Sequence, residues 1–130
     1  MVSRVPRFVI AFAGLIQLAG SVVHAAAFSR ADAAFAGSGL RPFFGNSSRA
    51  LWLGDSTTLA VVAVLCGLIA IWPSAASRPV VMVLAFIPAL IAVLIYVFLG
   101  MFFAGHMLLF SAAAMFFAGL KFPVISAKVA

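Results

Sequence analysis

Charged side chains are scarce in this sequence, and acidic ones are almost absent. Only 8% of the 130 residues are charged and just two are acids, whereas soluble domains carry roughly 25% charged residues. The apolar fraction is 67%, against roughly 45–50% in soluble domains. A soluble domain of this size exposes too much surface to hide so many apolar side chains. We therefore expect one integral membrane domain, residues 1–130, in a lipid bilayer.

Cysteine is also scarce, since Cys66 is the only one. A single thiol excludes an internal disulfide, a cysteine-based zinc site and an iron–sulfur cluster. The chain has no C-x-x-C-H haem-attachment motif, P-loop, dinucleotide fingerprint or nucleophile elbow. The sequence therefore favours a protein without catalytic activity of its own.

The basic residues outnumber the acidic ones and give a formal net charge of +6. Nucleic-acid binders also carry a positive charge, but they cluster Lys and Arg on one face near stacking aromatic rings. Here the basic residues lie between apolar runs, as loop charges do in membrane proteins: Arg4, Arg7, Arg30, Arg41, Arg49, Arg78, Lys121 and Lys128. We do not expect a nucleic-acid partner.

Four apolar runs are long enough to cross a membrane, because a hydrocarbon core of about 30 Å takes about 20 helical residues. They cover residues 8–28, 51–72, 80–99 and 103–122. Gly100 and Gly105 bracket the predicted turn between the last two runs, and Pro88 is predicted to kink the third. The sequence thus predicts an all-α fold, an up-down-up-down bundle of four transmembrane helices.

The first run also has features of a signal peptide. Arg4 and Arg7 form a basic N-terminal region, and Ala25-Ala26-Ala27 is similar to a cleavage site. The apolar run nevertheless reaches spanning length, which favours an uncleaved transmembrane helix.

The only long connection, residues 29–50, is predicted to form a small cap outside the membrane. Ser29 and Asp32 have the spacing of a helix capping box, which predicts a short helix as far as about Ala36. The following segment, Arg41–Gly45, is expected to be irregular. One of three polar residues is expected to cap the second span: Asn46, Ser47 or Ser48.

Basic residues in the connections predict the orientation, because such residues remain on the cytoplasmic side. One side holds Arg4, Arg7, Arg78, Lys121 and Lys128, and the other holds Arg30, Arg41 and Arg49. The sequence therefore predicts that both termini are cytoplasmic and that the first loop is external. Its Ala-rich composition favours a bacterial inner membrane.

Polar side chains inside the spans gather at one predicted depth. Trp52 and Trp72 are separated by 20 residues, about 30 Å along a helix. This spacing is typical of tryptophans that lie at the two membrane–water interfaces. Asp55 follows Trp52 by one turn, and each other span has a polar residue at a similar level. The candidate layer under the outer face comprises His24, Asp55, Tyr96, His106, Gln17, Ser21 and Thr58, with Arg41 and Arg49 as contributors from the loop.

Three helix faces are predicted to point into the bundle, because their small and polar residues recur at helical intervals. The first span contributes Gly14, Gln17, Ser21 and His24. The second span contributes Asp55 and Thr58, which are one turn apart. The third span contributes Ala85, Ala89, Ala92 and Tyr96, a stripe of the kind that lets membrane helices approach closely.

Asp55 is the only acid inside a predicted span, and an ionised carboxylate at membrane depth is costly unless it is paired or hydrated. We expect it to pair with His24 or His106, or with Arg41 or Arg49 from the loop. Such a layer has a purely structural interpretation, as a hydrogen-bond network that joins the helices.

A second interpretation is a site for a small ligand, since bundle cores are where such sites are built. The ligand could be b-type haem between His24 and His106, or a metal held by these two histidines and Asp55. Electron transfer, or a proton relay through Asp55 and His24, would be the corresponding function.

A third interpretation is an accessory subunit, whose Phe-rich and small-residue surfaces pack against a larger membrane protein or a second copy. The small size and the scarcity of ionisable groups favour this function. Ligand, haem or metal binding remains the alternative.

Overall fold

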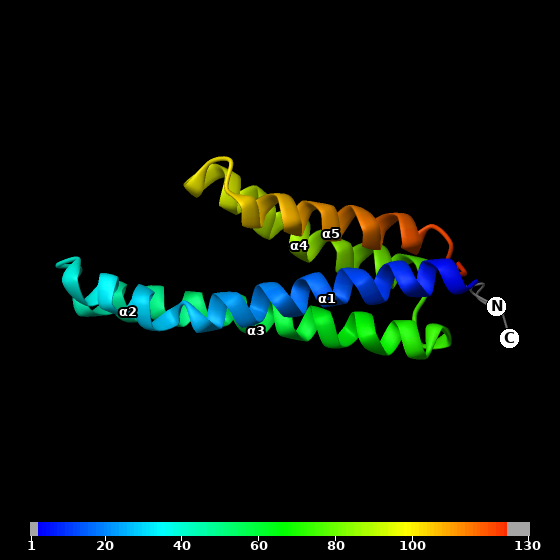
Figure 1. The fold of residues 1–130 in the computed structure, drawn as a ribbon, viewed down its shortest axis with the longest axis horizontal. Helices are drawn as coiled ribbons and strands as arrows, with labels where there is room; N and C mark the ends of the chain where they lie inside the picture. Colours follow the sequence, from blue (N-terminus) through cyan, green and yellow to red (C-terminus); the bar gives the residue numbers. More distant parts are fainter. Residues whose placement is uncertain (1–2, 125–130) are drawn as a thin grey trace, which may run out of the picture.

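The computed structural model describes residues 3–124, which contain helices and no β-strand (Figure 1). The elements are α1 (Arg4–Ala26), α2 (Phe28–Gly37), α3 (Pro42–Ile71), the short 3-10 helix η1 (Pro73–Ala75), α4 (Arg78–Leu99) and α5 (Phe103–Gly119). The predicted all-α class is confirmed. Helices α1, α3 and α4 are long and apolar enough to cross a membrane, and α5 is apolar but shorter, at 17 residues. This composition fits a lipid environment.

Helix α2 confirms the short helix predicted in the first connection, but the predicted capping box is wrong. The residue before α2 is Ala27, and no side chain caps the helix start. The backbone carbonyl of Ala27 accepts hydrogen bonds from the N–H groups of Arg30 and Ala31. Because α2 follows α1 after this single residue, Ser29 already lies inside the helix and cannot act as its cap.

Helix α3 begins earlier than the sequence predicted, so the irregular segment Arg41–Gly45 and the cap at Asn46, Ser47 or Ser48 are both wrong. Pro42 occupies the first helical turn, where its fixed φ and missing N–H are well tolerated. Ser48 lies within the helix, and its hydroxyl donates to the carbonyl of Phe44 at 2.9 Å. The 30 residues of α3 extend about 45 Å, longer than a hydrocarbon core of about 30 Å.

The turn between α4 and α5 lies where the two glycines predicted it. Gly100 has a φ of 72°, in the region that favours glycine. Pro88 is buried inside α4, which continues as one helix from Arg78 to Leu99.

The four longer helices form two antiparallel pairs (Figure 1). One pair is α1 with α3, and the other is α4 with α5. The two pairs meet mainly where α1 packs against α5. Helix α2 packs on the first part of α3. The largest buried side chains between them include Ile10, Val62, Val81, Met115 and Phe122. The predicted inward faces are buried at Gln17 and Ser21 on α1 and at Ala85 and Ala92 on α4. The inward prediction is wrong for Thr58 of α3, which is exposed because that side of the helix packs on no other helix of residues 3–124.

The two ends of the bundle differ in charge. Arg4, Arg7, Arg78 and Lys121 lie at the end where α1 and α4 begin, which we call the basic end. Lys128, assigned to this side from the sequence, lies outside the described residues. The opposite end, which we call the α2 end, carries α2, the first turns of α3 and the α4–α5 turn (Figure 1).

Two arginines at the basic end satisfy the last carbonyls of neighbouring helices. Arg7 of α1 donates to the carbonyls of Ala70 and Ile71, and Arg78 of α4 donates to the carbonyl of Phe122 after α5. The carbonyls at a helix C-terminus lack partners within the helix and carry partial negative charge. Arg7 therefore joins α1 to the C-terminal end of α3, and Arg78 joins the start of α4 to the segment that follows α5.

Candidate functional site

His24, near the end of α1, lies against two residues of α3. Its ring stacks on Trp52, with ring centroids 4.2 Å apart and planes 12° apart. Its Nε2 is 3.6 Å from Oδ2 of Asp55. Trp52 also donates from Nε1 to the backbone carbonyl of His24, at 2.9 Å. Because Trp52 and Asp55 are three residues apart, they share one face of α3 and hold the imidazole between them.

This His24–Trp52–Asp55 cluster is half open to the surroundings. The side chains of His24 and Asp55 are each 30% exposed. The pairing that the sequence proposed for Asp55 with His24 is thus present, at a level where the carboxylate can also be hydrated.

The two loop arginines proposed as partners of Asp55 lie elsewhere. Arg49 contacts the carboxylate of Asp32 through Nε and donates to Oδ1 of Asn46 at 3.1 Å. Arg41 is exposed, immediately before α3. The expectation for Arg49 fails because α3 begins at Pro42, which places this residue two turns into the helix and beside α2.

Tyr96 of α4 and His106 of α5 form a second, separate pair. The tyrosine hydroxyl and Nδ1 of His106 are 2.5 Å apart. The helices come close here because Gly105 has no side chain; a Cβ on it would lie 2.7 Å from Cε1 of Tyr96. Tyr96 is half-buried and His106 is exposed.

The two pairs are at similar heights above the basic end, as the predicted layer requires. Asp55 is 17 residues before Trp72, and Tyr96 is 18 residues after Arg78, so the heights are about 26 and 27 Å. However, one pair joins α1 to α3 and the other joins α4 to α5. The structure therefore divides the candidate layer into two polar pairs with different neighbours.

The remaining candidates form interhelical and local hydrogen bonds of their own. Buried Gln17 donates from Nε2 to Oγ of Ser111 on α5 at 2.8 Å, and that hydroxyl donates to the carbonyl of Ala13. Ser21 donates to the carbonyl of Ser56 on α3 at 2.8 Å. Exposed Thr58 donates to the carbonyl of Gly54 within its own helix. Gln17 and Ser21 therefore join helices, whereas Thr58 does not.

The sequence reasoning missed Ser111 and the stacking role of Trp52. Ser111 could have been found, because it is the only polar side chain between His106 and Lys121. Pairing it with Gln17 required knowing that α1 packs against α5. Trp52 was interpreted as a residue of the membrane–water interface, and only the close packing of α1 on α3 shows that it contacts His24.

The proposed metal ligands are not gathered in one place. Among residues 3–124, no group of three His, Cys, Asp or Glu side chains is close enough to hold a metal ion. His24 faces Trp52 and Asp55, whereas His106 bonds Tyr96 on the other helix pair. Of the three proposed ligands, His24 and Asp55 therefore lie on the α1–α3 pair and His106 lies on the α4–α5 pair.

Comparison with known proteins finds no matching family model, curated protein or solved structure.

Proposed function

We propose that the protein is a bundle of four membrane spans, α1, α3, α4 and α5, in a bacterial inner membrane. The antiparallel order of these helices supports an up-down-up-down path. Helix α5 is short, but its 17 residues reach the lower limit of about 17 for a span. The basic end is then cytoplasmic together with both termini, because basic residues favour that side, and α2 forms the external cap.

Within the membrane, the protein acts as an accessory subunit that packs the α4–α5 pair against a larger membrane protein. The observation that carries this proposal is the exposed Tyr96–His106 pair on an otherwise apolar surface. Polar and ionisable side chains at membrane depth are costly when they face lipid. A neighbouring chain that covers His106 and offers a hydrogen-bonding group to its Nε2 removes that cost, whereas the ring of His24 is partly covered by Trp52 and Asp55 of this chain.

The surface next to this pair suits a protein neighbour. Phe103, Phe110 and Phe117 recur every seven residues on α5 and are 69%, 56% and 67% exposed. Seven residues are two helical turns, so the three rings share one face, and aromatic rings are enriched at protein interfaces. The small-residue stripe of α4 is turned inward at Ala85 and Ala92, which leaves the phenylalanine face as the packing surface.

The test is gentle extraction from the native membrane, followed by the particle mass and the stoichiometry of the chains it contains. We expect a second membrane protein, or further copies of this chain, at a fixed ratio. His106→Leu together with Phe110→Ala should release the partner. His24→Leu is the matched control and should leave the complex intact. A particle that contains one copy of this chain and no partner would contradict the proposal.

The alternative function, binding of haem, a metal or another small ligand, has one observation in its favour. Tyr96 engages Nδ1 of His106, and Nε2 of the same ring makes no hydrogen bond within residues 3–124. Since His106 is exposed, Nε2 is accessible to an external ligand. A visible spectrum and a metal analysis of the same preparation test it. A Soret band that is lost in either His106→Ala or His24→Ala would support haem and displace the accessory role.

A further inference from the structure

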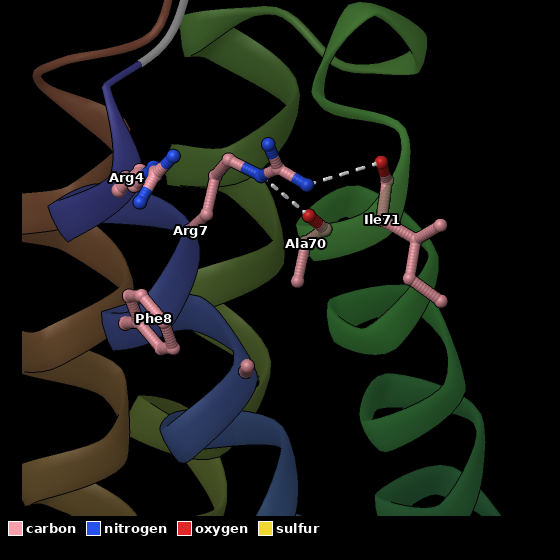
Figure 2. A pocket seen from close by; sticks show the side chains of 6 residues that line it. Arg4, Arg7, Phe8, Ala70 and Ile71 are labelled. Atoms are coloured by element: carbon pink, nitrogen blue, oxygen red, sulfur yellow. Dashed lines mark hydrogen bonds between the residues drawn. The ribbon is translucent and has the colours of Figure 1, made fainter.

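The basic end carries a pocket of about 410 Å³ between α1 and the end of α3 (Figure 2). Its lining residues are Arg4, Arg7, Phe8, Ala11, Ala70 and Ile71. Figure 2 shows the two arginines nearer the end of the bundle and Phe8 one turn further in. The pocket therefore combines two guanidinium groups with an apolar wall.

The guanidinium group of Arg7 is held in a defined orientation. Its Nε donates to the carbonyl of Ala70 at 2.7 Å, and Nη2 lies 3.4 Å from the carbonyl of Ile71. The third nitrogen, Nη1, has no hydrogen bond to the residues drawn in Figure 2. A group fixed in this way can offer the remaining N–H donors to an anion without first being ordered.

Arg4 adds a second positive charge that has no acidic counterpart nearby. It precedes Arg7 by three residues, so the two side chains are neighbours on one face of α1. The chain has two acidic side chains, and both lie at the α2 end, where Asp32 contacts Arg49 and Asp55 faces His24. Within residues 3–124, no acidic side chain therefore neutralises this arginine pair.

The apolar part of the pocket continues along the membrane-spanning part of α1. Phe8, Leu15, Leu18 and Val22 are exposed and follow Arg4 at helical spacing on the same face. A ligand that fits this face has an anionic group for the arginines and a hydrocarbon chain for the stripe. Guanidinium groups match the oxygen atoms of phosphate in charge and geometry.

We propose that this pocket binds the phosphate group of an anionic phospholipid, with an acyl chain of that lipid along the exposed face of α1. The cytoplasmic leaflet, in which the basic end lies under the proposed orientation, is the leaflet whose anionic lipids attract basic segments. Lipid binding at this pocket requires no protein partner, so its test is independent of the test of the accessory role.

Trp72 makes the proposal measurable, because it follows Ile71 directly and is exposed. In Trp52→Phe it is the only tryptophan. The protein is reconstituted in phosphatidylcholine vesicles that contain increasing amounts of phosphatidylglycerol, with brominated acyl chains on one lipid or the other. We expect brominated phosphatidylglycerol to quench Trp72 at about a fivefold lower mole fraction than brominated phosphatidylcholine. This factor corresponds to the attraction of about 1 kcal/mol between one basic residue and an anionic membrane surface. Equal quenching by the two lipids would overturn the proposal.

Arginine variants in the same background assign the effect to the pocket. Arg4→Gln should abolish most of the preference for phosphatidylglycerol, and Arg7→Lys should reduce it, because an ammonium group lacks the planar donor pair. Arg41→Gln removes the same charge at the α2 end and should leave the preference unchanged. If the preference survives Arg4→Gln, or is equally lost in Arg41→Gln, the pocket is not the site.

Arg4 makes no hydrogen bond within residues 3–124, so its replacement should leave the helical circular dichroism unaltered. A competition experiment on the Trp52→Phe protein, without further substitutions, distinguishes binding of a lipid from binding of a free anion. Inorganic phosphate added at a large excess should not reverse the quenching by brominated phosphatidylglycerol. Full reversal would show that the pocket takes free phosphate, and the lipid proposal would then be wrong.

Discussion

The two helix pairs of this protein place a histidine at the same height but surround it differently. In the α1–α3 pair, the ring of His24 stacks on Trp52 and its Nε2 faces Asp55 at 3.6 Å, so the imidazole is partly covered by α3. In the α4–α5 pair, His106 bonds Tyr96 alone among residues 3–124 and remains exposed. The difference shows that depth alone does not assign a role to a polar side chain in a membrane; its neighbours across the helix contact do.

The helix contacts themselves also differ, and glycine substitutions should break them to different extents. A Cβ at Gly14 would lie 2.8 Å from Cβ of Cys66 and 3.2 Å from the backbone oxygen of Ala63, neither of which can rotate away. Gly14→Ala should therefore destabilise the protein by about 2–3 kcal/mol. Gly105→Ala meets the ring of Tyr96, which can shift, so its cost should be smaller.

The measurement for the glycine variants is the free energy of unfolding in mixed detergent. Gly67→Ala is the control, because nothing lies within 4 Å of a Cβ at that position. It should be neutral or stabilising, since alanine favours a helix over glycine by about 1 kcal/mol. An equal loss of stability in Gly14→Ala and Gly67→Ala would contradict the close contact between α1 and α3.

The bond between Gln17 and Ser111 joins the two helix pairs, so its removal tests how firmly they are attached. Ser111→Ala leaves the buried Nε2 of Gln17 without its acceptor and should cost about 1–2 kcal/mol in the free energy of unfolding. In the background of Gln17→Leu the same substitution should cost less, because the amide is already gone. Additive losses in the double variant would show that the two side chains do not interact.

The smallest expected effect concerns the two histidines, and it bears directly on their different surroundings. His24→Leu removes a stacked ring and its contact with Asp55 and should lower the free energy of unfolding by about 1 kcal/mol. His106→Leu should change the stability of the isolated chain by less than about half of that. The fluorescence of Trp52, recorded in Trp72→Phe, should respond to His24→Leu only. A larger loss in His106→Leu would reverse the comparison.

The sequence allowed the helical class and most element positions to be predicted, because they depend on local patterns. Three of the four apolar runs form helices that are long and apolar enough to cross a membrane, and Gly100 marks the turn that the structure confirms. The start of α3 was missed, because Pro42 was interpreted as part of an irregular segment rather than as a first-turn residue. The capping role assigned to Ser29 failed because α1 and α2 follow each other with almost no break.

For the candidate site, the sequence by itself determined which residues are polar within apolar helices and roughly how deep they lie, because helical rise converts residue number into height. It also placed a basic excess on one side. Only the tertiary structure decided that His24 meets Asp55, that Arg49 contacts Asp32, and that His106 is separate from both. The reason is physical: a helix repeat specifies the face of each side chain, whereas the identity of the facing helix depends on how the whole set of helices packs.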